Sequence, residues 1–152
     1  MMALVGKRVY LDSNVFIYAV ERVAPYAELL APLFQSIVSG ETEAVTSEIA
    51  LAEVLVAPIR TANADARTAF VEVLDGPGVD LVPVTRAVLV QAARLRAASR
   101  LKLPDAVHAA TAQLASCDAL LTNDTGIRHA PGVPIVRLAD LASGGAPPEA
   151  GA

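Results

Sequence analysis

Four acidic residues stand apart in otherwise apolar surroundings, namely Asp12, Glu53, Asp105 and Asp124. Clustered carboxylates repel one another, and several of them stay ionised at neutral pH only if a cation lies between them. Because the ligand atoms would all be oxygens, such a cluster selects hard divalent ions such as Mg²⁺ or Mn²⁺ over zinc. A site of this kind can activate water, orient a phosphodiester and stabilise a leaving oxygen. These residue types therefore predict metal-dependent phosphodiester chemistry if the fold brings the four together.

Three of the four acids also have a local structural explanation. Asp12 comes where a predicted strand gives way to a predicted helix, and Asp is favoured as a cap or turn residue at such junctions. Asp105 falls in the first turn of a predicted helix, where the helix dipole favours a negative charge by roughly 0.3–1 kcal/mol. Asp124, in the sequence TNDTG, fits an ordinary turn. The prediction of a site therefore depends on the four acids acting as a set.

Glu53 is the acid that local structure explains least. It lies in residues 49–56, a helical segment that is apolar nearly all round and is therefore expected to be mostly buried. A buried carboxylate is costly unless it pairs with a cation or a metal. No Lys or Arg occurs between Arg22 and Arg60, so no partner is available on the same helix. A metal ligand and a long-range salt bridge remain the two interpretations.

Strand-like and helix-like segments alternate along the whole chain. Strands are predicted at residues 8–11, 43–46, 79–84, 119–122 and 134–137. Helices are predicted after Asp12, with Ser13 or Asn14 as cap, and at residues 24–39, 47–56, 64–74, 85–99 and 104–116. This alternation predicts an α/β domain whose sheet is mostly parallel and has helices on both faces.

Particular residues mark the ends of these helices and the place of the site. Ser47 and Thr85 are predicted N-caps, Pro58 is predicted to stop a helix, and Pro104 is predicted to be the first residue of another. In doubly wound sheets, sites form beyond the carboxyl ends of the strands, where the strand order reverses. Asp12 and Asp124 both come just after predicted strands, so this edge is the predicted location.

Length and composition predict one domain at residues 1–141 and a flexible tail at residues 142–152, whose sequence has almost nothing to bury. A single cysteine, Cys117, excludes an internal disulfide and a cysteine-based metal site. No apolar run approaches the roughly 18 residues needed to cross a bilayer, so we expect a soluble cytoplasmic protein with no membrane partner. The net charge of −4 argues against a general nucleic-acid binder. Five cations nevertheless gather in a short stretch, Arg86, Arg94, Arg96, Arg100 and Lys102. They form either a solvated helix face or a contact for phosphates.

Four segments carry a resemblance to a known family: VYLDSNVFIY, SEIALAEVL, LKLPDAVHAATA and LLTNDTGI. In this order they resemble the successive motifs of PIN-domain ribonucleases, and among these the VapC-type toxins of toxin–antitoxin pairs. The match spans residues 9 to about 138. It implies a three-layer α/β/α fold with a five-stranded, mostly parallel sheet, and metal-dependent endoribonuclease activity on single-stranded or looped RNA with Mg²⁺ or Mn²⁺. It also implies a homodimer and a cognate antitoxin protein.

The resemblance also implies roles for individual residues. By motif position, Asp12, Glu53, Asp105 and Asp124 form the catalytic and metal-binding site, and the polar residues Asn14 and Thr122 support it. Two positions depart from the pattern, as Ile127 stands where an aromatic residue is common and Gly126 stands near the place of a fifth acid in some relatives.

Other side chains and other folds give weaker predictions. His108, one turn after Asp105, is expected to be a hydrogen-bonded core or rim residue, with substrate binding as the alternative; His129 is expected at the surface. A haloacid-dehalogenase-type phosphatase needs a second Asp where this chain has Asn14. A receiver domain needs paired early acids and a lysine after its fourth or fifth strand, but this chain has no lysine after Lys102, so neither class fits. The remaining alternative is a catalytically inactive PIN-like module that binds protein or RNA.

Overall fold

Five short strands form a single sheet in the computed structural model, which describes residues 1–144. In spatial order the strands are β3 (Val79–Val82), β2 (Glu43–Ser47), β1 (Arg8–Leu11), β4 (Ala119–Thr122) and β5 (Ile135–Arg137). Every neighbouring pair is parallel. The three central strands are almost wholly buried, which explains why Val, Leu and Ala fill them. The predicted five-stranded parallel sheet is confirmed.

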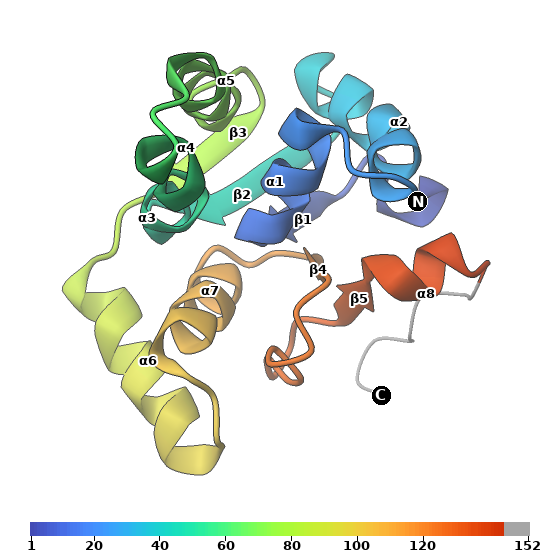
Figure 1. Ribbon diagram of the computed structural model, residues 1–152. Coiled ribbons are helices and arrows are strands. Elements are labelled where there is room, and N and C mark those ends of the chain that lie inside the picture. Colours follow the sequence, from blue (N-terminus) through green and yellow to red (C-terminus); the bar gives the residue numbers. More distant parts are fainter. Residues whose placement is uncertain (145–152) are drawn as a thin grey trace.

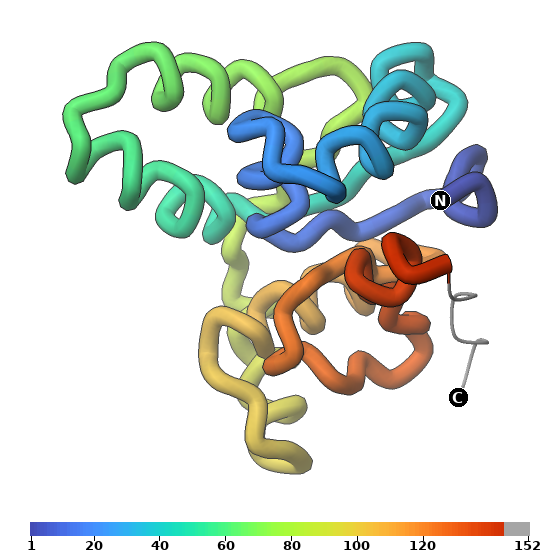
Figure 2. Tube along the Cα trace, turned by 45° about the vertical axis from the view of Figure 1, so that its right-hand side comes forward, coloured from blue at the N-terminus to red at the C-terminus, as the bar shows by residue number. Residues whose placement is uncertain are grey.

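Helices cover both faces of the sheet, so the domain has three layers (Figures 1 and 2). Side chains alternate along each strand, and Val9 and Leu11 point to one face while Tyr10 points to the other. The first face packs against α1 (Ser13–Glu21), α2 (Tyr26–Val38), α3 (Ile49–Val54), α5 (Ala64–Leu74) and α8 (Leu138–Ala142). The second packs against α6 (Arg86–Ala98) and α7 (Leu103–Leu114).

The helix predicted at residues 47–56 is shorter and less buried than expected. It is α3, which ends at Val54, and a separate short helix, α4 (Val56–Arg60), follows directly. Pro58 does not stop a helix but lies in the first turn of α4. Backbone N–H groups in a first turn have no acceptor within the helix, so a proline is tolerated there. Within the predicted helix, Ala52 and Val56 are exposed and Leu51 is only partly buried. The expectation of a mostly buried helix was therefore wrong.

Smaller differences concern the ends of elements. Asp12 itself caps α1 by accepting from the Ser13 amide, in place of the predicted Ser13 or Asn14. Thr85 caps α6 as predicted, and Pro104 is the second rather than the first residue of α7. Helix α8, which was not predicted, includes Ala142, the first residue of the predicted tail. Residues 145–152 of that tail lie outside the described part of the chain.

The order of the strands reverses beside β1, because the chain passes from β1 to β2 on one side and places β4 on the other. Leu11 of β1 pairs with Leu121 of β4, so Asp12 and Thr122 follow side by side at the carboxyl ends of the two strands. This is the predicted location of the site. Among residues 1–144, no helix is both long enough and apolar enough to span a membrane.

Candidate active site

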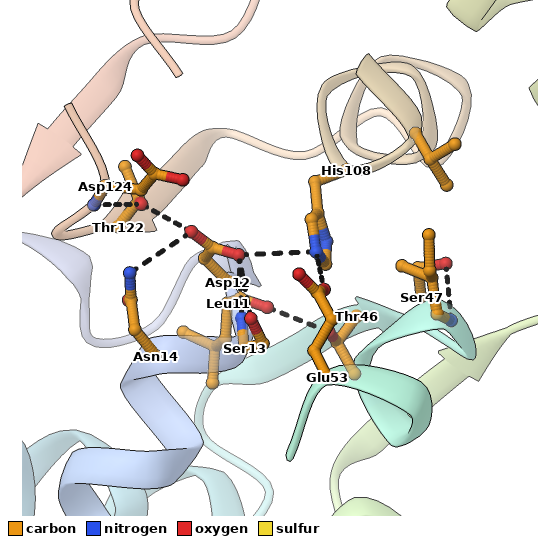
Figure 3. Close-up of polar contacts among 12 residues, drawn as sticks. Leu11, Asp12, Ser13, Asn14, Thr46, Ser47, Glu53, His108, Thr122 and Asp124 are labelled. Atoms are coloured by element: carbon orange, nitrogen blue, oxygen red, sulfur yellow. Dashed lines mark hydrogen bonds and ion pairs between the residues drawn. The ribbon is translucent and has the colours of Figure 1, made fainter. Parts of the chain in front are cut away.

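Asp12 lies at the end of β1 with only 3% of its surface exposed. Its Oδ1 accepts a hydrogen bond from the Ser13 backbone amide at 2.8 Å. Its Oδ2 accepts from Thr122 Oγ1 at 2.6 Å and from Asn14 Nδ2 at 3.4 Å (Figure 3). These donors replace the water that the buried carboxylate has lost and fix the direction of both oxygens. Asn14 and Thr122 are thus placed against Asp12, as supporting residues would be.

Glu53 reaches the same point from α3, on the opposite side of Asp12 from Thr122 (Figure 3). Its Oε1 lies 2.5 Å from Nε2 of His108, which comes from α7. The same nitrogen lies 3.4 Å from Asp12 Oδ1. The other ring nitrogen, Nδ1, is 2.6 Å from the hydroxyl of Tyr10, a core residue of β1. A helix from each face of the sheet therefore contributes a side chain to one polar cluster.

The surroundings change the proton affinities of the His108 ring and the Tyr10 phenol. Burial disfavours the imidazolium, but the hydrogen bond to Glu53 and the charge of Asp12 outweigh burial, and the pKa of His108 is raised. Burial, with the charge of Asp12 added, raises the pKa of Tyr10 well above its ordinary value. The phenol therefore keeps its proton and is available as a hydrogen-bond donor at neutral pH.

Asp105 and Asp124 form the other half of the cluster. Asp105 is the third residue of α7, and Asp124 follows β4, where its Oδ1 accepts from the Gly126 amide at 2.7 Å. A Cβ at position 126 would lie only 2.7 Å from Asp105 Oδ2 and 3.1 Å from Asp124 Oδ1. Glycine is thus what allows the loop to lie against both carboxylates, and a larger residue here would force the acids to move.

The charge on Asp105 is the basis of a prediction about stability. Burial, followed by the neighbouring Asp124, raises the pKa of Asp105 from 3.8 to about 6. The folded state then holds this proton more tightly than the unfolded chain does. The metal-free protein should gain stability from this group as pH falls from 7 through 6 toward 4, and lose it as pH rises through 6. We expect Asp105→Asn to raise the melting temperature in EDTA at pH 7.5, and the gain to vanish near pH 4.

A matched control for this variant is Asp65→Asn, which removes an exposed acid from the first turn of α5. Asp65 lies where the helix dipole favours a negative charge, so its loss should cost roughly 0.3–1 kcal/mol at pH 7.5. Thermal melts of both variants at the two pH values provide the measurement. If Asp105→Asn also destabilises the protein at pH 7.5, Asp105 is an ordinary helix-start charge and the crowding of carboxylates is contradicted.

Arg137 of β5 holds the loop that carries Asp124. Its guanidinium donates to the carbonyl oxygens of Asp124 at 2.6 Å and Ile127 at 2.9 Å. The Ile127 side chain is fully buried in the core beneath the loop. Ile127, which stands where an aromatic residue is common in the resembling family, therefore anchors the loop by packing, and Arg137 anchors it by hydrogen bonds.

A groove of about 840 Å³ runs beside the acids. Glu53, Asp105 and Asp124 line one part of it. Its other lining residues include the exposed cations Arg100, Lys102 and Arg128 and the exposed His129. Two of the five clustered cations thus lie at the groove, whereas Arg86, Arg94 and Arg96 do not line it. Such a groove has negative charge where a cation would sit and positive charge where phosphates could bind.

Three residues bring their donor atoms close enough together to hold one metal ion, and two further acids lie beside them. Among residues 1–144, one group has its donor atoms within 4.8 Å of one another, and it consists of Asp12, Glu53 and His108. Asp105 and Asp124 lie outside this group but beside it, because they line the same groove as Glu53 and both carboxylates lie against Gly126. The fold therefore gathers all four predicted acids at one edge of the sheet.

Two features of the site escaped the sequence prediction. Glu53 was expected on a mostly buried helix, but its side chain is 33% exposed. Of the two partners left open for it, a metal or a distant cation, the described residues supply His108, 55 residues along the chain. The Tyr10–His108 contact was not foreseen at all, although His108 was expected to be a hydrogen-bonded core residue and is one. The available signal was the spacing from Asp105 to His108, which places both on the same face of α7.

The family model of the PIN domain matches residues 9–133 of this chain. A comparison with curated proteins gave no match.

Solved structures with the same fold include three from bacteria. VapBC2 from Rickettsia felis, bound to a DNA fragment from its promoter, is 16% identical, with a TM-score of 0.65 over 86% of this chain and 98% of that one. A toxin–antitoxin complex from Klebsiella pneumoniae is 23% identical, with a TM-score of 0.61 over 82% and 94%. VapC20 from Mycobacterium tuberculosis, a sarcin–ricin loop cleaving toxin, is 14% identical, with a TM-score of 0.59 over 74% and 86%.

Proposed function

Because this chain belongs to the PIN domain family, we propose that it is a divalent-metal-dependent endoribonuclease and the toxin of a toxin–antitoxin pair. The observation that carries the proposal is the crowding of carboxylates beyond β1 and β4, where burial and Asp124 raise the pKa of Asp105 to about 6. Carboxylates that repel one another in this way favour a bound cation. The cations Arg100, Lys102 and Arg128, which line the groove beside the acids, support a phosphate-containing substrate.

In this proposal Asp12, Glu53, Asp105 and Asp124 hold Mg²⁺ or Mn²⁺. When bound, the ion supplies activation of water and neutralisation of phosphate charge. The chain supplies the positioning: Ser13, Asn14 and Thr122 orient Asp12, while Gly126 and Arg137 shape the loop of Asp124. Arg100, Lys102 and Arg128 bind phosphates of the RNA strand that lies in the groove.

The proposed partners are a second copy of the chain and a cognate antitoxin protein. The structural neighbours include a toxin–antitoxin complex and a toxin named for cleaving the sarcin–ricin loop, and these likenesses support the same roles here. A second support is the exposed apolar hollow of about 580 Å³ on α3 and α4, lined mainly by Leu51, Leu55, Val56 and Ile59. Exposed apolar area of this kind commonly marks a protein–protein contact.

The test is cleavage of single-stranded RNA by the purified protein. We expect cleavage in Mg²⁺ or Mn²⁺, complete loss in EDTA, and recovery when the metal is restored, because the carboxylate cluster needs the cation. The Asp12→Asn variant, purified in the same way, controls for contaminating nucleases. Cleavage by the pure protein in EDTA contradicts the metal mechanism. Binding of metal without cleavage of any RNA would favour the inactive protein- or RNA-binding module.

A further inference from the structure

A buried chain of hydrogen bonds runs from the core into the candidate site. It begins at the Tyr10 hydroxyl, passes through both nitrogens of His108 and ends at Glu53, with donor–acceptor distances of 2.6 Å and 2.5 Å. Tyr10 and His108 are 0% and 1% exposed, whereas the Glu53 side chain is 33% exposed. One end of this hydrogen-bond series is thus buried in the core, and the partly exposed end is the Glu53 carboxylate. Figure 3 shows the His108 ring pointing between Asp12 and Glu53.

The chemistry of the three groups fixes where the protons lie. The Tyr10 phenol has one proton to donate, and Nδ1 of His108 lies 2.6 Å from its oxygen. The contacts of Tyr10 with the Thr46 side chain and the Ser47 backbone lower the pKa of the phenol, so they act on its oxygen as acceptor and leave its proton for Nδ1. A neutral imidazole that accepts at Nδ1 carries its proton at Nε2. Nε2 faces Glu53 and Asp12, whose carboxylates can only accept when ionised. A bare Nε2 would instead set a lone pair 2.5 Å from a carboxylate oxygen. Nε2 therefore carries a proton whether the ring is neutral or charged.

We propose that His108 is a positioning residue, held in the Nε2–H tautomer by Tyr10, whose N–H keeps the Glu53 carboxylate beside Asp12 for a divalent cation. The inference rests on the proposed metal-dependent function. His108 then orients the metal ligand Glu53 and is not a metal ligand itself, although its nitrogen lies within 4.8 Å of the donor oxygens. The donor set for the cation is then all oxygen, which favours Mg²⁺ or Mn²⁺ over softer ions.

The side chain of Glu53 needs such a constraint more than the other acids do. Asp12 accepts hydrogen bonds from three neighbouring residues, Ser13, Asn14 and Thr122, and Asp124 is held by the loop amide of Gly126. Glu53 has one more rotatable bond than Asp and lies at the edge of the open groove. Its contact with His108 is the side-chain hydrogen bond that the described residues give it. Without it, the carboxylate is free to turn into the groove.

The first experiment reads the tautomer directly by long-range ¹H–¹⁵N correlation of the imidazole rings. The chain has only two histidines, and His129→Gln removes one set of signals and so assigns His108. In the metal-free protein we expect a protonated Nε2 and an accepting Nδ1, and saturation with Mg²⁺ should leave that proton in place. Loss of the Nε2 proton on Mg²⁺ binding would identify His108 as a ligand and overturn the proposal.

The second experiment measures Mn²⁺ affinity by electron paramagnetic resonance. His108→Leu removes the donor, and we expect Mn²⁺ to bind about 10–100-fold more weakly, the usual effect of losing an outer partner of a metal ligand. His108→Gln should restore most of the affinity, because its amide N–H can reach Glu53. Melting curves show whether each variant is folded, and the wild-type tautomer decides the question if one is not.

The outcomes separate this inference from the function on which it rests. Wild-type affinity in both folded His108 variants overturns the positioning role and leaves the proposed nuclease intact. Failure of the wild-type protein to bind Mn²⁺ at all overturns the proposed function, and the positioning role with it. Neither readout requires RNA cleavage.

Discussion

Asp12→Asn is expected to reduce RNA cleavage by more than about 100-fold, because it alters a proposed metal ligand. Loss of a residue that only hydrogen-bonds to a ligand already costs roughly 10–100-fold. Asp12 is the acid at the centre of the cluster, between Thr122 and the Glu53–His108 pair. The amide keeps the shape of the carboxylate, and its oxygen can still accept from the Ser13 amide that caps α1. Cleavage in Mn²⁺ and a thermal melt in EDTA provide the two measurements, and the melt should show a folded protein.

The matched control is Asp80→Asn, the same chemical change in β3. Asp80 is exposed and pairs with Arg8, the first residue of β1, at the opposite end of the sheet from the site. Its exposed ion pair is worth at most about 1 kcal/mol, and cleavage should be unchanged. Equal cleavage by Asp12→Asn and the wild type would remove Asp12 from the site.

If the acids share a cation, their effects should not add. Each amide substitution alone is expected to abolish most cleavage, so the double variant Asp12→Asn/Glu53→Gln should be hardly worse than either single one. Independent contributions would instead multiply. The contacts favour the first outcome because Asp12 and Glu53 approach the same His108 nitrogen.

The sequence predicted the sheet and the place of the site because both depend on local patterns. Short apolar runs are typical of buried parallel strands, and four of the five predicted runs begin and end within one residue of the observed strands. Parallel strands end at one edge, and because β1 and β4 are neighbours there, Asp12 and Asp124, which follow them, lie close together.

The rest of the site depends on contacts between residues far apart in the chain. Tyr10 and His108 are separated by 98 residues, and His108 and Glu53 by 55, so no local pattern contains these hydrogen bonds. Glu53 was expected to be buried because its helix is apolar nearly all round. The helix is instead exposed along one side, where Leu51 and Ala52 line a hollow. An apolar sequence alone does not distinguish a core segment from an exposed apolar patch.

Glu53→Gln is the variant that separates a metal ligand from a structural ion pair. A buried ion pair that loses one partner is destabilised by about 3–5 kcal/mol. Glu53 is one-third exposed, and the amide oxygen of the variant can still accept the Nε2–H of His108. We therefore expect the free energy of unfolding in EDTA to change by no more than about 1 kcal/mol, the scale of one hydrogen bond. Cleavage in Mn²⁺, in contrast, should fall by more than about 100-fold. Losing a residue that only hydrogen-bonds to a metal ligand already costs roughly 10–100-fold, and this variant alters a proposed ligand itself.

Glu43→Gln provides the same chemical change away from the site. Glu43 is the first residue of β2, is exposed, and pairs with Arg8 at 2.8 Å. Its replacement should leave cleavage intact and cost at most about 1 kcal/mol. The two variants thus lose the same charge from one helix and one strand, and only the location differs. A marked loss of stability in Glu53→Gln, with cleavage retained, would make the Glu53–His108 contact a structural ion pair and leave Asp12, Asp105 and Asp124 as the remaining candidates for the metal site.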